Sequence, residues 1–302
     1  MTQRAIALLV FALRLSVCGL LSACATPIIP ADDPSLLGKI IDARTDLPVS
    51  RDELFRRAAG SHFVILGEVH DNAIHHQLQA EILASILRQG RSPALAMEQF
   101  DREHQPALEA ARAAGEREAE RIADAGRFDR KSWQWPDYKP LVQIAASNGL
   151  TIIAANLSRS DARALMRSGR RAEGIEPASP EIQAELERDI VDGHCGFRPP
   201  APVLSGMVEA QRARDAMMAK ALTASGTAGA VLIAGAGHAR RDRGVPAYLP
   251  PGLREKVLSI GFLEVEPSEQ PAANRFAGLF DLVWFTPRAE REDPCKNFRL
   301  QQ

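Results

Sequence analysis

Residues 62–72 read HFVILGEVHDN, an apolar run typical of a buried strand that leads directly into acidic, histidine and amide side chains. Three more apolar runs end in the same way: ALAM (94–97) leads into Glu98, TIIAA (151–155) into Asn156, and AVLIA (230–234) into Gly-Ala-Gly-His238. In an open parallel sheet, side chains that follow the carboxyl ends of the strands converge on one crevice. The sequence therefore predicts a single polar site built from four strand ends.

The segments between these strands have the residue spacing of helices. Apolar residues recur every three or four positions from Ile74 to Leu87, after Asp71 or Asn72 as a helix cap and before Gly90 as a stop. Other helices are expected at 51–59, 102–127, 138–148, 180–192 and 204–224, and two late strands at 256–265 and 280–285. We therefore predict an α/β fold with an open, mostly parallel sheet of five or six strands, flanked by helices, with smaller helical insertions at about 101–135 and 160–204.

The first 23 residues (1–23) predict export and attachment to a lipid. They carry Arg4 and an apolar stretch, and they end in Leu-Ser-Ala before Cys24, which resembles the lipobox of bacterial lipoproteins. Cys24 would then be acylated and would anchor the domain to a membrane. Ala25 is not the Asp that retains lipoproteins in the inner membrane, so we expect the outer membrane, facing the periplasm. The alternatives are an ordinary cleaved signal and an N-terminal membrane anchor, although Arg14 interrupts the apolar run.

The rest of the chain predicts one large domain. A segment rich in Pro and Asp (24–36) is interpreted as a tether, and the domain is expected from about residue 37 to 302 (37–302). Lys and Arg total 37, Asp and Glu total 38, and the two signs are intermixed along the chain. This balance provides no basic patch for nucleic acid, so we expect no nucleic acid as a partner.

Two cysteines of the domain, Cys195 and Cys295, are expected to pair. In an envelope compartment disulfides persist, and this one would tie the C-terminal segment to the body of the domain. Two alternatives stay open, namely free thiols, or Cys195 acting with the adjacent His194 as a metal ligand.

Two Gly-x-x-His segments mark the predicted site. Glu68 and His70 follow Gly67, which permits a sharp turn away from the strand, and His238 closes the second segment. Glu98 stands at the tip of an apolar strand, where a carboxyl is either ionised beside a cation or shifted to a higher pKa by burial. Both outcomes are common at functional sites.

A pair of adjacent histidines lies one helical turn beyond the first segment. Because neighbouring helix residues point about 100° apart, only one of the two can face the crevice. We expect this one to be His75, with His76 exposed to solvent.

Several motifs together carry a family resemblance. They comprise Gly67–Asn72 with His75-His76, Ala96–Phe100, Trp135–Pro140, Ala154–Asn156, Gly193–Gly196, Ala210–Asp215 and Gly235–His238 with Gly244-Val-Pro. In order and spacing they resemble the ChaN-type haem-binding lipoproteins over about residues 37–286, and a wider group that includes the Tiki and TraB-type proteins.

The resemblance to ChaN implies an envelope lipoprotein that binds haem for iron or haem uptake or storage. It also implies a homodimer, with haem at the subunit interface and tyrosine ligation of the iron. Tyr138 is the first candidate ligand, with Trp135 and Lys139 beside it, and Tyr248 is a weaker one. The alternative for Tyr138 is a residue at a helix N-terminus that packs the insertion onto the sheet.

The wider Tiki and TraB resemblance implies a different function, a metal-dependent protease or esterase. A divalent metal ion would be held by His70, Glu98 and His238, with His75 nearby, and would activate a water molecule. Glu68 would then act as general base. A purely structural envelope lipoprotein is the third possibility.

Overall fold

The computed structural model describes residues 36–168, 170–172, 174–265, 276–293 and 295–296. The predicted signal segment, Cys24 and nearly all of the tether lie outside the described residues. Within these ranges, no helix combines the length and the apolar character that a membrane span requires.

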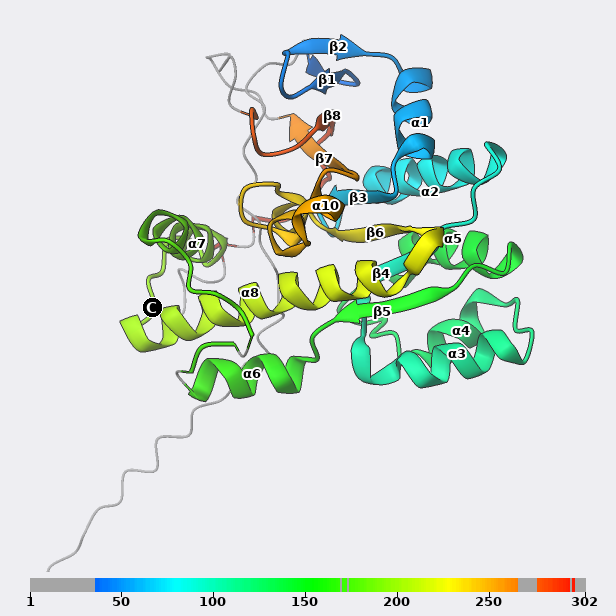
Figure 1. Ribbon diagram of the computed structural model, residues 1–302. Coiled ribbons are helices and arrows are strands. Elements are labelled where there is room, and N and C mark those ends of the chain that lie inside the picture. Colours follow the sequence, from blue (N-terminus) through cyan, green and yellow to red (C-terminus); the bar gives the residue numbers. More distant parts are fainter. Residues whose placement is uncertain (1–35, 169, 173, 266–275, 294, 297–302) are drawn as a thin grey trace, which may run out of the picture.

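The described chain contains an eight-stranded sheet with the order β2-β1-β8-β7-β3-β6-β4-β5 (Figure 1). The strands are β1 (Ile40–Asp42), β2 (Leu47–Val49), β3 (Phe63–Glu68), β4 (Ala94–Asp101), β5 (Ile152–Asn156), β6 (Ala230–Gly235), β7 (Val257–Val265) and β8 (Leu282–Pro287). The six strands β3 to β8 run parallel, whereas β1 is antiparallel to both β2 and β8. The predicted α/β class and mostly parallel sheet are confirmed. The predicted strand count was too low, because β1 and β2 have three residues each and are too short to show a periodic pattern.

Helices cover both faces of this sheet (Figure 1). Their bounds are α1 (Arg51–Gly60), α2 (Ala73–Arg88), η2 (Arg102–His104), α3 (Gln105–Ala113), α4 (Ala119–Ala125), α5 (Trp135–Ser147), α6 (Arg159–Ser168), α7 (Pro180–Gly193), α8 (Ala201–Ala224), η3 (Gly226–Ala228), α9 (Ala236–Ala239), η4 (Val245–Tyr248) and α10 (Pro251–Arg254). Helices α1, α2 and α5 pack on one face, and α8 and α9 pack on the other. Helices α6 and α7 lie against α8.

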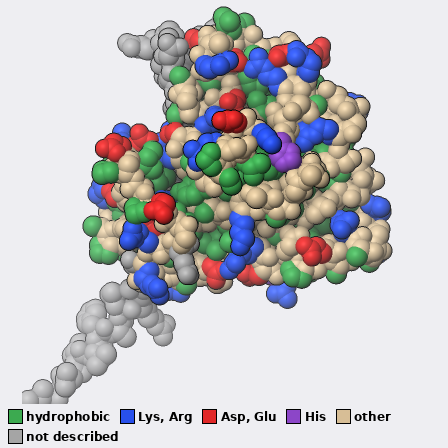
Figure 2. Space-filling model, viewed as in Figure 1, with side chains coloured by type: hydrophobic (Ala, Val, Ile, Leu, Met, Phe, Trp, Pro, Cys, Tyr) green, Lys and Arg blue, Asp and Glu red, His purple; other side chains and the backbone are tan. Residues whose placement is uncertain are grey.

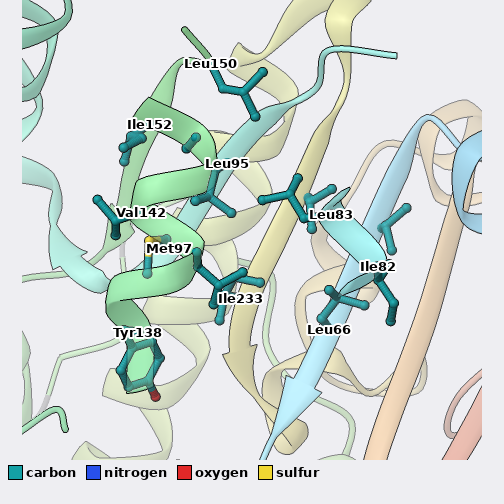
Figure 3. Packing of buried hydrophobic residues seen from close by; sticks show 14 of the residues in the cluster. Leu66, Ile82, Leu83, Leu95, Met97, Tyr138, Val142, Leu150, Ile152 and Ile233 are labelled. Carbon is teal, nitrogen blue, oxygen red and sulfur yellow. The ribbon is translucent and has the colours of Figure 1, made fainter. Parts of the chain in front are cut away.

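Side-chain alternation along the strands builds the two cores. On β6, Val231 and Ile233 belong to the core under α2 and α5, whereas Leu232 belongs to the core under α8. Figure 3 shows Ile233 among side chains of the first core, with Ile82 of α2 and Val142 of α5 also in it. Helix α2 begins at a side-chain cap, because the side chain of Asn72 accepts the backbone N–H of Ile74. Asn72 is one of the two residues that we expected as this cap. The sheet is therefore covered on both sides, and its carboxyl edge carries the polar residues.

Gly67 lies inside β3 and not in a turn, which corrects our prediction. A Cβ at this position would lie 2.6 Å from the Cβ of Ala239 and 2.9 Å from the Cα of Ala236, so the glycine lets α9 pack directly on the strand.

A Gly67→Ala variant is expected to lose about 1–3 kcal/mol of unfolding free energy, because backbone atoms must move to admit the methyl group. Urea denaturation followed by circular dichroism measures this loss. Gly60→Ala is the matched control, since a Cβ at Gly60 meets nothing within 4 Å and the residue ends a helix. Equal stability of the two variants would contradict the close approach of α9.

Cys195 and Cys295 form a disulfide with a Cα–Cα distance of 5.5 Å. This is the pair that we expected, and the alternatives of free thiols and a metal ligand at Cys195 are wrong. The bond joins the segment after α7 to the segment after β8. On the face in Figure 2, Lys and Arg side chains are interspersed with Asp and Glu, so charge of one sign does not dominate this surface.

Candidate functional site

Glu68 is the centre of a buried polar network at the end of β3. Its carboxylate, 0% exposed, accepts hydrogen bonds from two amides, with Gln79 Nε2 at 2.6 Å and Gln99 Nε2 at 3.2 Å. The hydroxyl of Tyr138 also donates to it, and His70 Nδ1 lies 2.9 Å from Oε1. A carboxylate with this many donors is strongly favoured in its ionised form.

His76 supplies the opposite charge. Its Nδ1 lies 3.2 Å from Glu68 Oε2 and its Nε2 lies 3.1 Å from the carbonyl oxygen of His70. Burial alone raises the pKa of Glu68, but the nearby charge of His76 and the hydrogen bonds from His70 and His76 outweigh it and hold this pKa well below its usual range. For the histidine, burial has the opposite effect and lowers the pKa of His76, but the nearby Glu68 carboxylate outweighs burial and raises this pKa above its ordinary value. The two side chains therefore form a buried ion pair.

The structure corrects our prediction for the adjacent histidines. Both are buried, with exposed fractions of 0% for His75 and 1% for His76, and it is His76 that contacts Glu68. His75 Nδ1 accepts the backbone N–H of Val69 at 2.9 Å, and its Nε2 lies 2.7 Å from the hydroxyl of Thr286 on β8. Burial lowers the pKa of His75 to about 3, so this ring is neutral and has a structural role. Neither ring reaches solvent, since the His75 ring lies against Phe262 and the His76 ring lies against Tyr138.

A second network surrounds His238 at the end of β6. Its Nδ1 lies 2.6 Å from Asp215 Oδ1 on α8, and its Nε2 lies 3.4 Å from Glu98 Oε1. The other oxygen of Glu98 accepts the backbone N–H of Gly235 at 2.9 Å. Burial raises the pKa of Glu98, but the charge and hydrogen bond of His238 outweigh burial and lower this pKa below its ordinary value. For Asp215 burial is the larger effect, so its pKa stays raised. The imidazole of His238 therefore lies between two buried carboxylates.

Gly235 brings the two networks together. A Cβ on this residue would lie 2.9 Å from His70 Nε2 and 3.8 Å from His238 Cδ2, so the two rings flank the same glycine. The His70 ring meets the Trp133 ring edge-on with centroids 4.9 Å apart, and its side chain is 20% exposed. The four predicted strand ends therefore do converge. Each of the strands β3 to β6 extends one to four residues beyond its apolar run. The last strand residues therefore include the polar or glycine positions Glu68, Glu98, Asn156 and Gly235.

The predicted metal ligands are not gathered into one group. Among the residues that the structure describes, no three His, Cys, Asp or Glu side chains are placed to hold a metal ion together. His75 is turned to β8, and His238 and Glu98 are paired with each other. The described residues therefore do not form the ligand set that a metal-dependent hydrolase requires.

The predicted haem-binding residues lie on α5 but face different surroundings. Tyr138 is 0% exposed and donates to Glu68, and burial raises its pKa well above the ordinary value. Trp135 Nε1 donates to Glu120 at 2.9 Å, and Lys139 Nζ pairs with the same carboxylate at 3.0 Å. In this conformation the phenol of Tyr138 does not reach a surface-bound haem, which favours the alternative that it packs α5 onto the sheet. Tyr248 is half-buried, and burial raises its pKa to about 12.

A cavity lies near the amino-terminal ends of β4 and β5, whereas the polar networks lie at the carboxyl edge of the sheet. It has a volume of about 620 Å³ and extends between the C-terminal half of α8, the starts of β4 and β5, and the η2–α3 segment. Leu150, Ile153, Met217 and Ala221 form apolar parts of its wall, and Lys220 stands at its α8 side. The volume falls within the range of small-molecule sites, about 300–1,000 Å³.

Several residues of the polar site were missed from the sequence. Asp215, Gln211, Gln79 and Gln99 all contact the predicted residues. A signal existed for them, because Gln211 and Asp215 stand four residues apart on α8 and Gln79 stands three residues after His76, within otherwise buried helix faces.

Comparison with known proteins provides an independent line of evidence. A family model described as haem-binding uptake, Tiki superfamily, ChaN matches residues 54–249. Among solved structures, the fold is similar to ChaN of Campylobacter jejuni, described for its cofacial haem binding, with a TM-score of 0.68 and 22% identity over 81% of this chain and 95% of that chain. The type III effector HopBA1 matches with a TM-score of 0.44 and 16% identity over 85% of this chain and 100% of that chain. No curated protein matches the chain.

Proposed function

Because the chain belongs to the haem-binding uptake family ChaN of the Tiki superfamily, we propose that it binds haem. The observation that carries the proposal is the extent of the family match. Residues 54–249 include both polar networks at the strand ends and the part of α8 that lines the 620 Å³ cavity.

The polar crevice itself does not fit haem. Glu68, Glu98 and His238 are 0% exposed, and Glu68 and His238 contact neighbouring polar side chains. A porphyrin needs a wide apolar surface, and these strand ends present buried ion pairs instead. Tyr138 is equally enclosed.

The 620 Å³ cavity fits haem better. Leu150, Ile153 and Ala221 give part of its wall an apolar surface for a macrocycle, and the thioether of Met217 is a side-chain donor of the kind that ligates haem iron in cytochromes. The ammonium group of Lys220 stands among its lining residues and attracts carboxylates, whereas Arg102 in the same lining already pairs with Asp161, and Glu103 and Glu109 contribute negative charge. When bound, haem would supply an iron that takes axial ligands from the protein. Met217 and Lys220 would hold the group, and the apolar part of the wall would face the macrocycle.

We further propose a site of action in the bacterial envelope. The lipobox-like sequence before Cys24 supports an acylated lipoprotein of the outer membrane that faces the periplasm. The disulfide between Cys195 and Cys295 supports an oxidising compartment. Haem or iron uptake or storage, by a homodimer, is the role that the family implies.

A titration of the purified protein with hemin tests haem binding. We expect a Soret band that saturates, and an absence of saturable binding would remove the proposal. Met217→Leu preserves the apolar volume but removes the sulfur, so we expect an altered spectrum and affinity at least about tenfold lower, equal to about 1.4 kcal/mol.

Met207→Leu, on the same helix but outside the cavity, is the matched control and should bind like the wild type. Tyr138→Phe should also bind like the wild type. If Tyr138→Phe loses binding while Met217→Leu keeps it, haem binds elsewhere and through the phenol.

A further inference from the structure

A second cavity lies beside the polar crevice, at the carboxyl ends of β4 and β5. Its volume is about 80 Å³, and we call it the arginine cavity, after Arg127, Arg159 and Arg214 in its lining. Gln99 of β4, Asn156 of β5 and the ring of Trp133 complete the wall on the crevice side. A water molecule occupies about 30 Å³ in the liquid, so this space suits a group of a few heavy atoms and is far too small for a porphyrin.

Two buried acceptors of the arginine cavity have no hydrogen-bond partner among the described residues. These acceptors are Gln99 Oε1 and Asn156 Oδ1, and the two residues are 4% and 5% exposed. The amide orientation of Gln99 is determined by its Nε2, which donates to Glu68 Oε1 at 3.2 Å, because an ionised carboxylate can only accept. The other amide atom of Gln99, Oε1, is therefore an acceptor. A buried acceptor without a donor is costly, so its presence in a cavity wall indicates a ligand that brings a donor.

The same cavity carries excess positive charge. Three arginines line it, against the two carboxylates Asp101 and Asp129. Asp129 is already engaged, since its Oδ2 pairs with Arg159 at 3.0 Å and accepts the hydroxyl of Ser132 at 2.7 Å. Arg214 is only 8% exposed, and its charge acts on the carboxylates of Asp101 and Asp215. Planar guanidinium groups bind carboxylate and phosphate oxygens through paired N–H donors.

We infer that the arginine cavity binds a small oxyanion that also carries an O–H or N–H donor, such as a 2-hydroxycarboxylate or a protonated phosphate. The arginines take the anionic oxygens, and the carbonyl oxygens of Gln99 and Asn156 accept the donor. This site is additional to haem binding and does not depend on it. Through Gln99 the ligand connects to Glu68, and through Trp133 to the ring of His70.

Two pairs of anions, with and without a hydrogen-bond donor, test whether the cavity requires the donor in addition to the negative charge. Lactate and propionate have nearly the same size, but only lactate carries a hydroxyl donor, and at neutral pH phosphate carries a donor that sulfate lacks. We expect lactate and phosphate to bind at least about tenfold more tightly than propionate and sulfate, because an analogue without the donor leaves unpaired the buried acceptor that the hydroxyl hydrogen would meet. The readout is the fluorescence of Trp133, identified by its loss in Trp133→Phe, with calorimetry on the same samples.

Three variants complete the test. Arg127→Ala removes an exposed guanidinium and should weaken all four anions, whereas Arg121→Ala, 74% exposed on α4 and outside the cavity, should weaken none. Asn156→Leu should reduce the preference for lactate over propionate. Equal binding of lactate and propionate, or no response of any anion to Arg127→Ala, would overturn the inference even if Asn156→Leu fails to fold. A normal hemin titration alongside such a failure would leave haem binding intact.

Discussion

A Glu68→Gln variant is expected to be about 3–5 kcal/mol less stable than the wild type, because it leaves the charge of His76 buried without its partner. The replacement keeps the size of the side chain but removes the negative charge that His70, His76 and Tyr138 share. An amide also brings two donors into a pocket that already supplies only donors. Unfolding in urea at pH 6, followed by circular dichroism, measures the loss.

Glu120→Gln is the matched control. The carboxylate of Glu120 also collects several donors, from Trp135, Lys139 and Arg130, but it lies at the surface. Solvent screens exposed pairs of this kind, so we expect little change in stability. If the two variants lost equal stability, burial would not be the cause.

The pH dependence of the difference follows from the two shifted pKa values. The pKa of Glu68 is lowered, so its contribution is present above the unfolded carboxyl value of about 4.3 and is lost as the pH falls through the lowered pKa. The pKa of His76 is raised, so its contribution is fully present below the unfolded value of about 6.5 and is lost as the pH rises through the raised pKa. The gap between wild type and Glu68→Gln should therefore be widest between about pH 4.5 and 6.5.

Removal of the disulfide is the other large expected effect. The bond between Cys195 and Cys295 closes a loop of sequence separation 100, which restricts the unfolded chain. In the chain-entropy model this restriction is worth about 4–5 kcal/mol, and measured losses for native disulfides span about 2–5 kcal/mol. We expect a Cys195→Ser/Cys295→Ser double variant to unfold at a correspondingly lower urea concentration.

A reducing agent provides the control for this variant. Reduction should bring the wild type to the stability of the double variant and should leave the double variant unchanged. If reduction had no effect on the wild type, the disulfide would not contribute to stability under these conditions.

Local patterns were sufficient for most of the elements. The apolar runs before Glu68, Glu98, Asn156 and Gly235 correspond to β3, β4, β5 and β6, and the cap at Asn72 begins α2 as expected. These features depend on residues a few positions apart, which is the range over which periodicity and capping act. The short strand β1 is stabilised by pairing with β8, more than 230 residues away, and β2 pairs with β1, so three residues in each strand give little local signal.

The sequence by itself determined the fold class, the convergence of polar strand ends, the cysteine pair and the family resemblance. Only the tertiary structure decided which buried polar groups meet, and therefore what the site can do. Tyr138 lies 70 residues from Glu68, and Asp215 lies 23 residues from His238, yet each pair is in direct contact. The partner of a buried polar group is set by how distant helices and strands pack, and its burial then sets its charge. For that reason His238 and Glu98, which were expected to hold a metal ion, lie against each other instead, and the unpaired amide oxygens of Gln99 and Asn156 point to a ligand that carries a hydrogen-bond donor.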